Sequence, residues 1–230
     1  MSRQHTANFD EHPPVPVGDY DAMARGVNVG YELIFELATA LLRAHCPSDA
    51  HLLLVGAGGS TEVQAFGAAD PRWRLTIVDP SADMLSLARA RVDACDLADR
   101  VQLVRGTLDD LPADARFDAA TAIFVMMHLP DDGSKLYLLR TIAERLKPGA
   151  PLLLVDGVLD HLDRFAPAWQ HYAVARGTPS ERMSAFLEGL AAGSTATTEA
   201  RELALLDEAG FRDATRFFTA FLISGWIARR

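Results

Sequence analysis

Short apolar runs alternate with amphipathic stretches along most of this chain. The apolar runs are residues 51–55, 75–78, 101–104, 119–125 and 152–155. Between and before them lie segments whose apolar residues recur at helical spacing, namely 29–45, 60–69, 84–92 and 132–146. Buried strands that alternate with helices predict a mostly parallel sheet with helices on both faces, an α/β fold of the doubly wound type.

The C-terminal part of the chain follows a different pattern. Residues 160–177 predict helix and loop, and Thr178-Pro179-Ser180-Glu181 predicts a capping box that starts another helix. The apolar face of that helix needs cover, either above a bound ligand or from a second subunit in a homodimer. A small-residue linker at 193–198, a helix at 199–209 and strands at 212–217 and 220–228 complete a seven-stranded sheet.

We find no internal repeat and no long linker, so we expect one domain over residues 1–230. It would consist of an N-terminal arm and helix at 1–48, a cofactor-binding core at 49–157, a helical lid at 158–200 and a C-terminal helix with strands at 201–230. The arm contains His12-Pro13-Pro14-Val15-Pro16, which excludes a regular helix there.

Charge and composition limit the partners. The net charge of −9 disfavours binding to nucleic acid, because phosphate backbones repel an acidic chain without a basic patch. No apolar run approaches the roughly 18 residues of a membrane span, and the polar start lacks the apolar core of a signal peptide. We therefore expect a cytoplasmic protein that binds small molecules. The two cysteines are too few for a disulfide framework or a Cys-based zinc site, and no His or Asp spacing predicts a metal site.

A glycine-rich turn, Gly56-Ala57-Gly58-Gly59, follows the first predicted strand. In an open parallel sheet, ligands bind beyond the carboxyl ends of the strands, and glycines there let the backbone approach a ligand closely. Asp79 ends the second strand about twenty residues later, where an acid commonly holds the two hydroxyls of an adenosine ribose. A nicotinamide-binding fingerprint would need a third glycine where Thr61 stands, so the pattern favours a different adenosine cofactor.

Five ordered segments between residues 50 and 157 resemble the motifs of class I S-adenosylmethionine-dependent methyltransferases. These segments are Leu53-Leu54-Val55-Gly56-Ala57-Gly58-Gly59, Thr76-Ile77-Val78-Asp79, Arg105-Gly106-Thr107-Leu108-Asp109-Asp110-Leu111-Pro112, Phe117-Asp118 with the strand after it, and Leu146-Lys147-Pro148-Gly149-Ala150. The resemblance implies a Rossmann-like sheet whose last strand is antiparallel. It also implies S-adenosylmethionine as the cofactor.

The resemblance also implies which residues contact the cofactor. Met84 matches the residue that packs on the adenine, and Thr107 stands where the family often has an Asp that receives the adenine amino group. Thr107, the backbone of Leu108 or Asp109 could contact the adenine in place of that Asp. The expected cofactor-binding set is Tyr31, Gly56, Ala57, Gly58, Asp79, Pro80, Met84, Thr107, Leu108, Asp109, Ile123, Phe124 and Arg182.

Tyr31 and Arg182 enter this set through a closer resemblance. The segments 20–37 and 178–230 resemble the flanks of carboxy-S-adenosylmethionine synthases, which act in tRNA wobble-uridine modification. In that family a tyrosine matching Tyr31 and an arginine matching Arg182 contact the cofactor, and the arginine reaches its extra carboxylate. An Asn of that family corresponds to Ile123 here, so we expect plain S-adenosylmethionine.

The chemistry implied is direct in-line transfer of a methyl group to a small-molecule acceptor, for which the protein supplies alignment and water exclusion. His128, at the mouth of the fourth strand, is the candidate for a general base. Two alternatives remain open. One is a carboxy-S-adenosylmethionine synthase-like enzyme, and the other is a catalytically silent protein that binds the cofactor.

Overall fold

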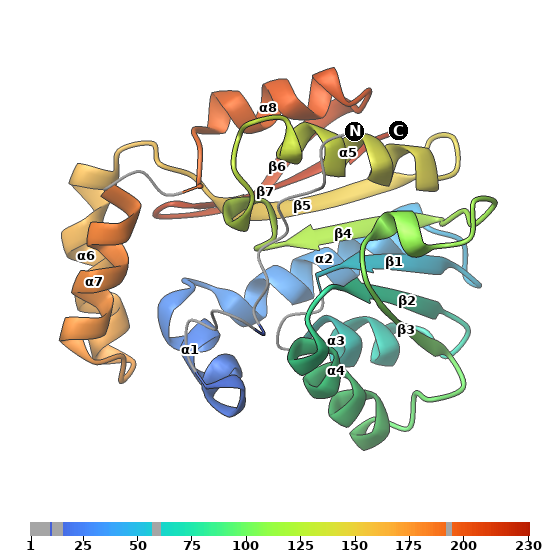
Figure 1. Ribbon diagram of the computed structural model, residues 1–230, viewed down its shortest axis with the longest axis horizontal. Helices are drawn as coiled ribbons and strands as arrows, with labels where there is room; N and C mark the ends of the chain where they lie inside the picture. Colours follow the sequence, from blue (N-terminus) through green and yellow to red (C-terminus); the bar gives the residue numbers. More distant parts are fainter. Residues whose placement is uncertain (1–9, 11–15, 57–60, 192–194) are drawn as a thin grey trace.

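A computed structural model describes residues 10, 16–56, 61–191 and 195–230 (Figure 1). The predicted cofactor-binding residues Ala57 and Gly58 lie outside the described residues. In the part of the chain described, no helix is long and apolar enough to cross a membrane.

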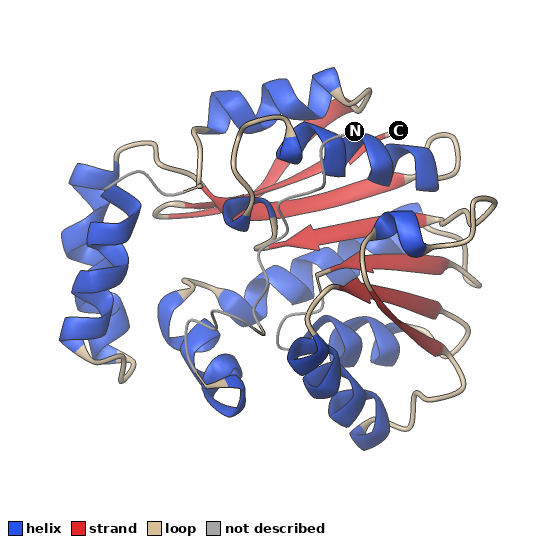
Figure 2. Cartoon of the chain, in the orientation of Figure 1, coloured by secondary structure: helices blue, strands red, loops and turns tan. Residues whose placement is uncertain are grey.

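One sheet forms the centre of the molecule (Figure 2). It has seven strands in the order β3-β2-β1-β4-β5-β7-β6 (labelled in Figure 1). The strands are β1 (His51–Val55), β2 (Arg74–Asp79), β3 (Val101–Arg105), β4 (Ala119–Ile123), β5 (Pro151–Gly157), β6 (Arg212–Ala220) and β7 (Ile223–Arg229). Strand β7 is antiparallel to both of its neighbours, β5 and β6, and the other pairs are parallel. The predicted doubly wound, mostly parallel seven-stranded sheet with an antiparallel last strand is confirmed.

Helices cover both faces of the sheet because successive strand residues point in opposite directions. Leu52 and Leu54 of β1 pack with α2 (Tyr31–His45), α3 (Thr61–Ala69) and α4 (Ala82–Ala94). Leu53 and Val55 of the same strand pack on the other face with α5 (Ser134–Arg145) and α8 (Glu199–Glu208).

A third apolar cluster joins residues of β4, β5, β6 and β7 to a cap, which we define as α1 (Tyr20–Val27), α6 (Leu162–Ala175) and α7 (Ser180–Ala191). The indole Nε1 of Trp169 donates to the Val27 carbonyl oxygen at 2.7 Å, which joins α6 to α1. Figure 1 shows α6 and α7 as a pair at one end of the molecule, with α1 between them and the sheet. The apolar face of α7 is covered within the chain, where Met183 and Leu190 are buried and Phe186 packs edge-on against Trp169.

The structure corrects several predicted elements. The sequence pattern missed α1 as a separate helix. The strand predicted at 119–125 ends at Ile123, because Phe124 adopts a left-handed conformation with φ of 58°. The predicted capping box is wrong, since α7 begins at Ser180 and the Thr178 side chain packs against Gly26 of α1. The last two strands differ as well, with β6 extending to Ala220 and β7 beginning at Ile223.

Candidate active site

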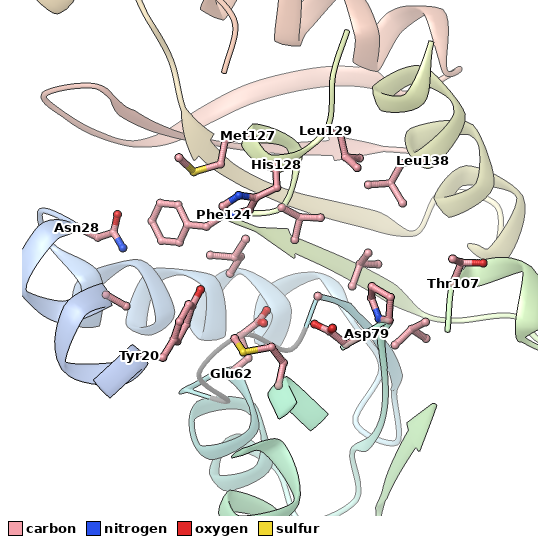
Figure 3. A pocket seen from close by; sticks show the side chains of 18 of the residues that line it. Tyr20, Asn28, Glu62, Asp79, Thr107, Phe124, Met127, His128, Leu129 and Leu138 are labelled. Carbon is pink, nitrogen blue, oxygen red and sulfur yellow. The ribbon is translucent and has the colours of Figure 1, made fainter. Parts of the chain in front are cut away.

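A pocket lies where β1, β2 and β4 end (Figure 3). Strand β1 has β2, the next strand along the chain, on one side and β4 on the other. The strand order therefore reverses at β1. This is where open α/β sheets bind their ligands. Residues of α1, of α2 and of α7 close the pocket from the side of the cap, among them Met23, Tyr31 and Phe186.

Gly56 forms the floor of the pocket at the end of β1. Its φ is +74°, and a Cβ atom built there would lie 2.7 Å from Cγ2 of Val125. A side chain would therefore meet both a left-handed backbone and a filled space. The close approach between the β1 and β4 ends depends on glycine at this position.

Asp79 is buried at the end of β2 and lines the pocket. The backbone N–H of Ser81 donates to its Oδ1 at 2.8 Å, which orients the carboxyl group. Ser81 in turn caps α4 by accepting from the Met84 N–H at 3.1 Å. Asp10 also lies at this helix start, where its carboxylate accepts from the backbone N–H groups of Ala82 and Asp83 at 3.0 and 3.2 Å.

Glu62 is a pocket residue that the sequence analysis missed. It lies in the first turn of α3, is 5% exposed, and accepts a hydrogen bond from Oγ1 of Thr121 on β4 at 2.7 Å. Burial raises the pKa of Glu62 to about 8, against the opposing effect of the Thr121 hydrogen bond. The sequence signal was an acidic residue in a helix whose other residues are mostly apolar.

Aromatic side chains form the wall next to the cap. The Tyr31 and Phe124 rings stack with centroids 6.5 Å apart, and the Tyr31 hydroxyl and Thr61 Oγ1 are within hydrogen-bond distance at 3.2 Å. Tyr20 lines the same wall, and burial together with the nearby carboxylates raises its pKa to about 12. Both phenols are therefore neutral at physiological pH.

His128 lines the opposite side of the pocket, where Figure 3 draws it beside Met127 and across from Glu62 and Asp79. Burial lowers its pKa to about 4, and the charge of Lys135 adds to the effect. The imidazole is consequently neutral at pH 7. A group with so low a pKa is a weak proton acceptor, but it can still orient a ligand by hydrogen bonding.

A buried ionic cluster supports the segment that carries His128. Lys135 of α5 is fully buried, and its Nζ donates to the carbonyl oxygen of Met126 in the 3₁₀ turn η3 (Met126–His128). The same Nζ lies 3.9 Å from Oε1 of Glu202, and Asp156 accepts from the Met127 N–H at 2.9 Å. Burial raises the pKa of both carboxyl groups, and Lys135 opposes that shift.

Ten of the residues singled out by sequence line this pocket. They are Tyr31, Gly56, Asp79, Pro80, Met84, Thr107, Leu108, Ile123, Phe124 and His128. Thr107 is engaged within its own turn, since its hydroxyl lies 3.4 Å from Oδ2 of Asp110 and its backbone N–H donates to the same oxygen.

Two other predicted residues lie elsewhere. Asp109 is exposed, and its carboxylate accepts from the Tyr137 hydroxyl at 2.9 Å. Arg182 is exposed on α7 and is not a lining residue of the pocket. The reason is the phase of that helix, which turns Met183 and Phe186 inward and Arg182 toward solvent.

The pocket fits the cofactor that the sequence resemblance implies. A backbone approach that excludes a Cβ atom, a buried carboxyl at the end of β2 and the apolar Met84 and Leu108 suit a ribose with its adenine. Among the described residues, no group of three or more His, Cys, Asp or Glu side chains is arranged to hold a metal ion.

Comparison with known proteins agrees with this arrangement. Residues 53–152 match the family profile of the Methyltransferase domain. The chain is 34% identical over 162 residues to the demethylmenaquinone methyltransferase of Lactiplantibacillus plantarum, across 67% of this chain and 64% of that protein. It is 34% identical over 125 residues to the O-methyltransferase cnsE of Penicillium expansum, across 54% of this chain and 44% of that protein. The chain thus spans less than two thirds of the length of both relatives.

The fold is shared with solved structures. A SAM-dependent methyltransferase from Aquifex aeolicus superposes with a TM-score of 0.64 at 16% identity, covering 94% of this chain and 98% of the other. At that identity the likeness concerns the fold alone. Residues 53–152 thus resemble a methyltransferase domain, and the relatives named as methyltransferases and the shared fold agree with that resemblance.

Proposed function

We propose that this chain is an S-adenosylmethionine-dependent methyltransferase that acts on a small, uncharged acceptor. The observation that carries the proposal is the pair formed by Gly56 and the buried Asp79, side by side where the strand order reverses. When bound there, S-adenosylmethionine would supply a methyl group on a positively charged sulfur. The acceptor's nucleophile would bond to the methyl carbon in line with the breaking carbon–sulfur bond, and the sulfur would leave as a neutral thioether.

In this proposal each wall of the pocket binds a different part of the cofactor or the acceptor. Asp79 accepts hydrogen bonds from the ribose hydroxyls, and Met84 and Leu108 pack against the adenine. Gly56 and Ile123 provide the floor, and Tyr31 with Phe124 bounds the space left for the acceptor. His128 orients the acceptor by hydrogen bonding, and the cap excludes water from the reacting atoms.

The lining supports an acceptor that is apolar and flat. Around Phe124 the described lining residues are mostly apolar or aromatic, including Met23, Val27, Met127 and Phe186, and none of those that line the pocket is Lys or Arg. An anionic acceptor would lose its hydration there without gaining a countercharge. Relatives named as quinone and O-methyltransferases agree with an aromatic acceptor of this kind.

The carboxylated cofactor has less support. An extra carboxylate would need a cationic partner, and Arg182, the residue matched to that role, is exposed on α7. Mass spectrometry of the ligand that co-purifies with the protein separates the two cofactors. The homodimer predicted from the sequence stays a prediction, which light scattering tests.

The proposed function is tested by binding and turnover together. Calorimetry should show one site for S-adenosylhomocysteine, the expected product. A labelled methyl group from S-adenosylmethionine should appear on neutral quinols or phenols but not on matched carboxylic acids. Binding without transfer to any acceptor in extracts would instead indicate a catalytically silent cofactor-binding protein. Absence of binding would contradict the proposal.

A further inference from the structure

We propose that Glu62 binds the ammonium group at the amino-acid end of the cofactor, so that Glu62 and Asp79 hold the two ends of one ligand. This inference rests on the proposed function, because it assigns a partner for one part of S-adenosylmethionine. It gives a ligand-binding role to a buried carboxyl group of α3.

The position of Glu62 relative to Asp79 is the first argument. Strand β1 lies between β2 and β4. Asp79 ends β2, whereas the hydrogen bond from Thr121 holds Glu62 beside β4. The two carboxyl groups therefore flank the end of β1 at Gly56. A ligand that lies across Gly56 with its ribose at Asp79 has its other end at Glu62.

The charge of the pocket is the second argument. The described lining residues include these two carboxyl groups and neither Lys nor Arg. The nearby arginines pair elsewhere, since Arg91 lies 3.0 Å from Asp21 and Arg25 lies 3.7 Å from the same carboxylate. A pocket with buried acid and no cation of its own suits a positively charged ligand, and S-adenosylmethionine carries both a sulfonium and an ammonium group.

The hydrogen-bonding state of Glu62 is the third argument. Among the described residues Thr121 is the donor to this carboxyl group, and it reaches Oε1. Figure 3 draws Glu62 among the side chains that line the pocket, on the same side as Asp79. The second oxygen is therefore available to a donor on the ligand.

Binding of an ammonium group should change the protonation of Glu62. Burial holds its pKa near 8, so the empty pocket keeps the carboxyl mostly protonated at pH 7. The titratable side chains that line the pocket with it are Tyr20 on α1, Tyr31 on α2, Asp79 on β2 and His128 on η3. Of these, none brings a positive charge at pH 7 that could stabilise the carboxylate. An incoming ammonium group would do so, and the proton would pass to solvent.

The experiment compares S-adenosylhomocysteine with its des-amino analogue, which keeps the carboxylate and lacks the ammonium group. Calorimetry of Glu62→Gln should show at least a tenfold weaker affinity for S-adenosylhomocysteine and less than a twofold change for the analogue. Glutamine keeps the shape and can still accept from Thr121. Glu188→Gln, an exposed carboxyl that does not line the pocket, is the control and should leave both affinities unchanged.

A second measurement uses the unaltered protein and does not depend on the folding of any variant. Calorimetry at pH 7 in two buffers of different ionisation enthalpy should show proton release with S-adenosylhomocysteine and not with the analogue. Equal losses for both ligands in Glu62→Gln, or equal proton release for both, would overturn the role of Glu62 alone. Failure of the unaltered protein to bind either ligand would instead overturn the proposed function.

Discussion

At the scale of residues, two carboxyl groups in one pocket have different surroundings. Asp79 receives a backbone N–H at 2.8 Å at the start of a capped helix, where a negative charge is stabilised. Glu62 receives one hydroxyl hydrogen bond in a buried site, and its pKa rises to about 8. The carboxyl group of Asp79 is therefore suited to accept hydrogen bonds from hydroxyls at one end of the pocket. That of Glu62 is suited to lose its proton when a cation binds at the other end.

Asp79→Asn should weaken binding of S-adenosylhomocysteine by about 10- to 30-fold, equivalent to roughly 1.4–2 kcal/mol for lost charge-assisted hydrogen bonds. Affinity for free adenine, which lacks the ribose, should stay nearly unchanged. Calorimetry with both ligands makes the comparison. A parallel loss for adenine would mean that Asp79 shapes the pocket and does not hold the ribose.

The raised pKa of Glu62 also predicts how stability depends on pH. Between about pH 4.5 and pH 8 the folded protein keeps a proton that the unfolded chain has lost, so this group makes stability fall as pH rises. Glu62→Gln should remove that component. The stability of the variant relative to the unaltered protein should rise by on the order of 2 kcal/mol or more from pH 5 to pH 8. Urea denaturation at both pH values measures it, with the exposed Glu188→Gln as control. A difference that does not change with pH would contradict the prediction.

The sequence predicts a site residue when the neighbouring chain sets its position, and misses it when a contact with a distant residue does. Gly56 and Asp79 follow directly from strands that end in a turn, so their spacing indicated their place. Glu62 depends on a contact with Thr121, 59 positions away, and Asp10 depends on a helix start more than 70 positions away. Neither contact leaves a local pattern. The phase of α7, which decided the exposure of Arg182, depended on packing against Trp169.

At the scale of elements, the strands and long helices were predictable, and α1 was not. Strand β1 matched its apolar run because every one of its side chains after the first is buried. Helix α1 has eight residues, too few to be stable by itself, and its order comes from contacts with α2 and α6. Left-handed residues at the ends of elements, Phe124 after β4 and Gly133 before α5, set boundaries that periodicity placed two residues away.

The turn η3 is an element whose position depends on buried charge, which leads to a prediction for Lys135. Lys135→Met removes the donor to the Met126 carbonyl and leaves Asp156 and Glu202 buried without a cation. The free energy of unfolding should fall by about 3–5 kcal/mol, the cost of an uncompensated buried charge. Oε2 of Glu202 is buried and without a hydrogen-bond partner in the described part of the chain, so Glu202→Gln in the same protein should recover part of the loss.

Lys147→Met is the matched control for this prediction. Lys147 pairs with Asp118 at 2.6 Å, but its side chain is 50% exposed, and such a pair contributes at most about 1 kcal/mol. Urea denaturation of the unaltered protein, the three single variants and the double variant of Lys135→Met with Glu202→Gln gives the comparison. Equal losses for the two lysines, or additive effects of Lys135→Met and Glu202→Gln, would show that the buried cluster is not a coupled unit.

At the scale of the whole molecule, the three apolar clusters divide the chain into a sheet with two covered faces and a cap. The first two clusters share the strands, whereas the third consists mainly of α1, α6, α7 and the start of α2. The pocket lies between the cap and the ends of the strands, so access to it depends on how firmly the cap is held. Regions with their own cluster and few links to the rest commonly open as a unit.

Two tryptophans allow this division to be tested, because each donates its indole N–H to a backbone carbonyl in a different cluster. Trp169 donates to Val27 at 2.7 Å within the cap, and Trp73 donates to Pro47 at 3.3 Å against the sheet. Trp169→Phe should speed hydrogen exchange in α1, α6 and α7 together, with exchange in α5 and α8 unchanged. Trp73→Phe removes a similar bond and should leave the cap unchanged. Each lost bond should reduce local stability by about 1 kcal/mol, so exchange should accelerate about fivefold where the bond acts. A uniform acceleration in Trp169→Phe would mean that the cap and the sheet open only together, and that ligands enter without independent movement of the cap.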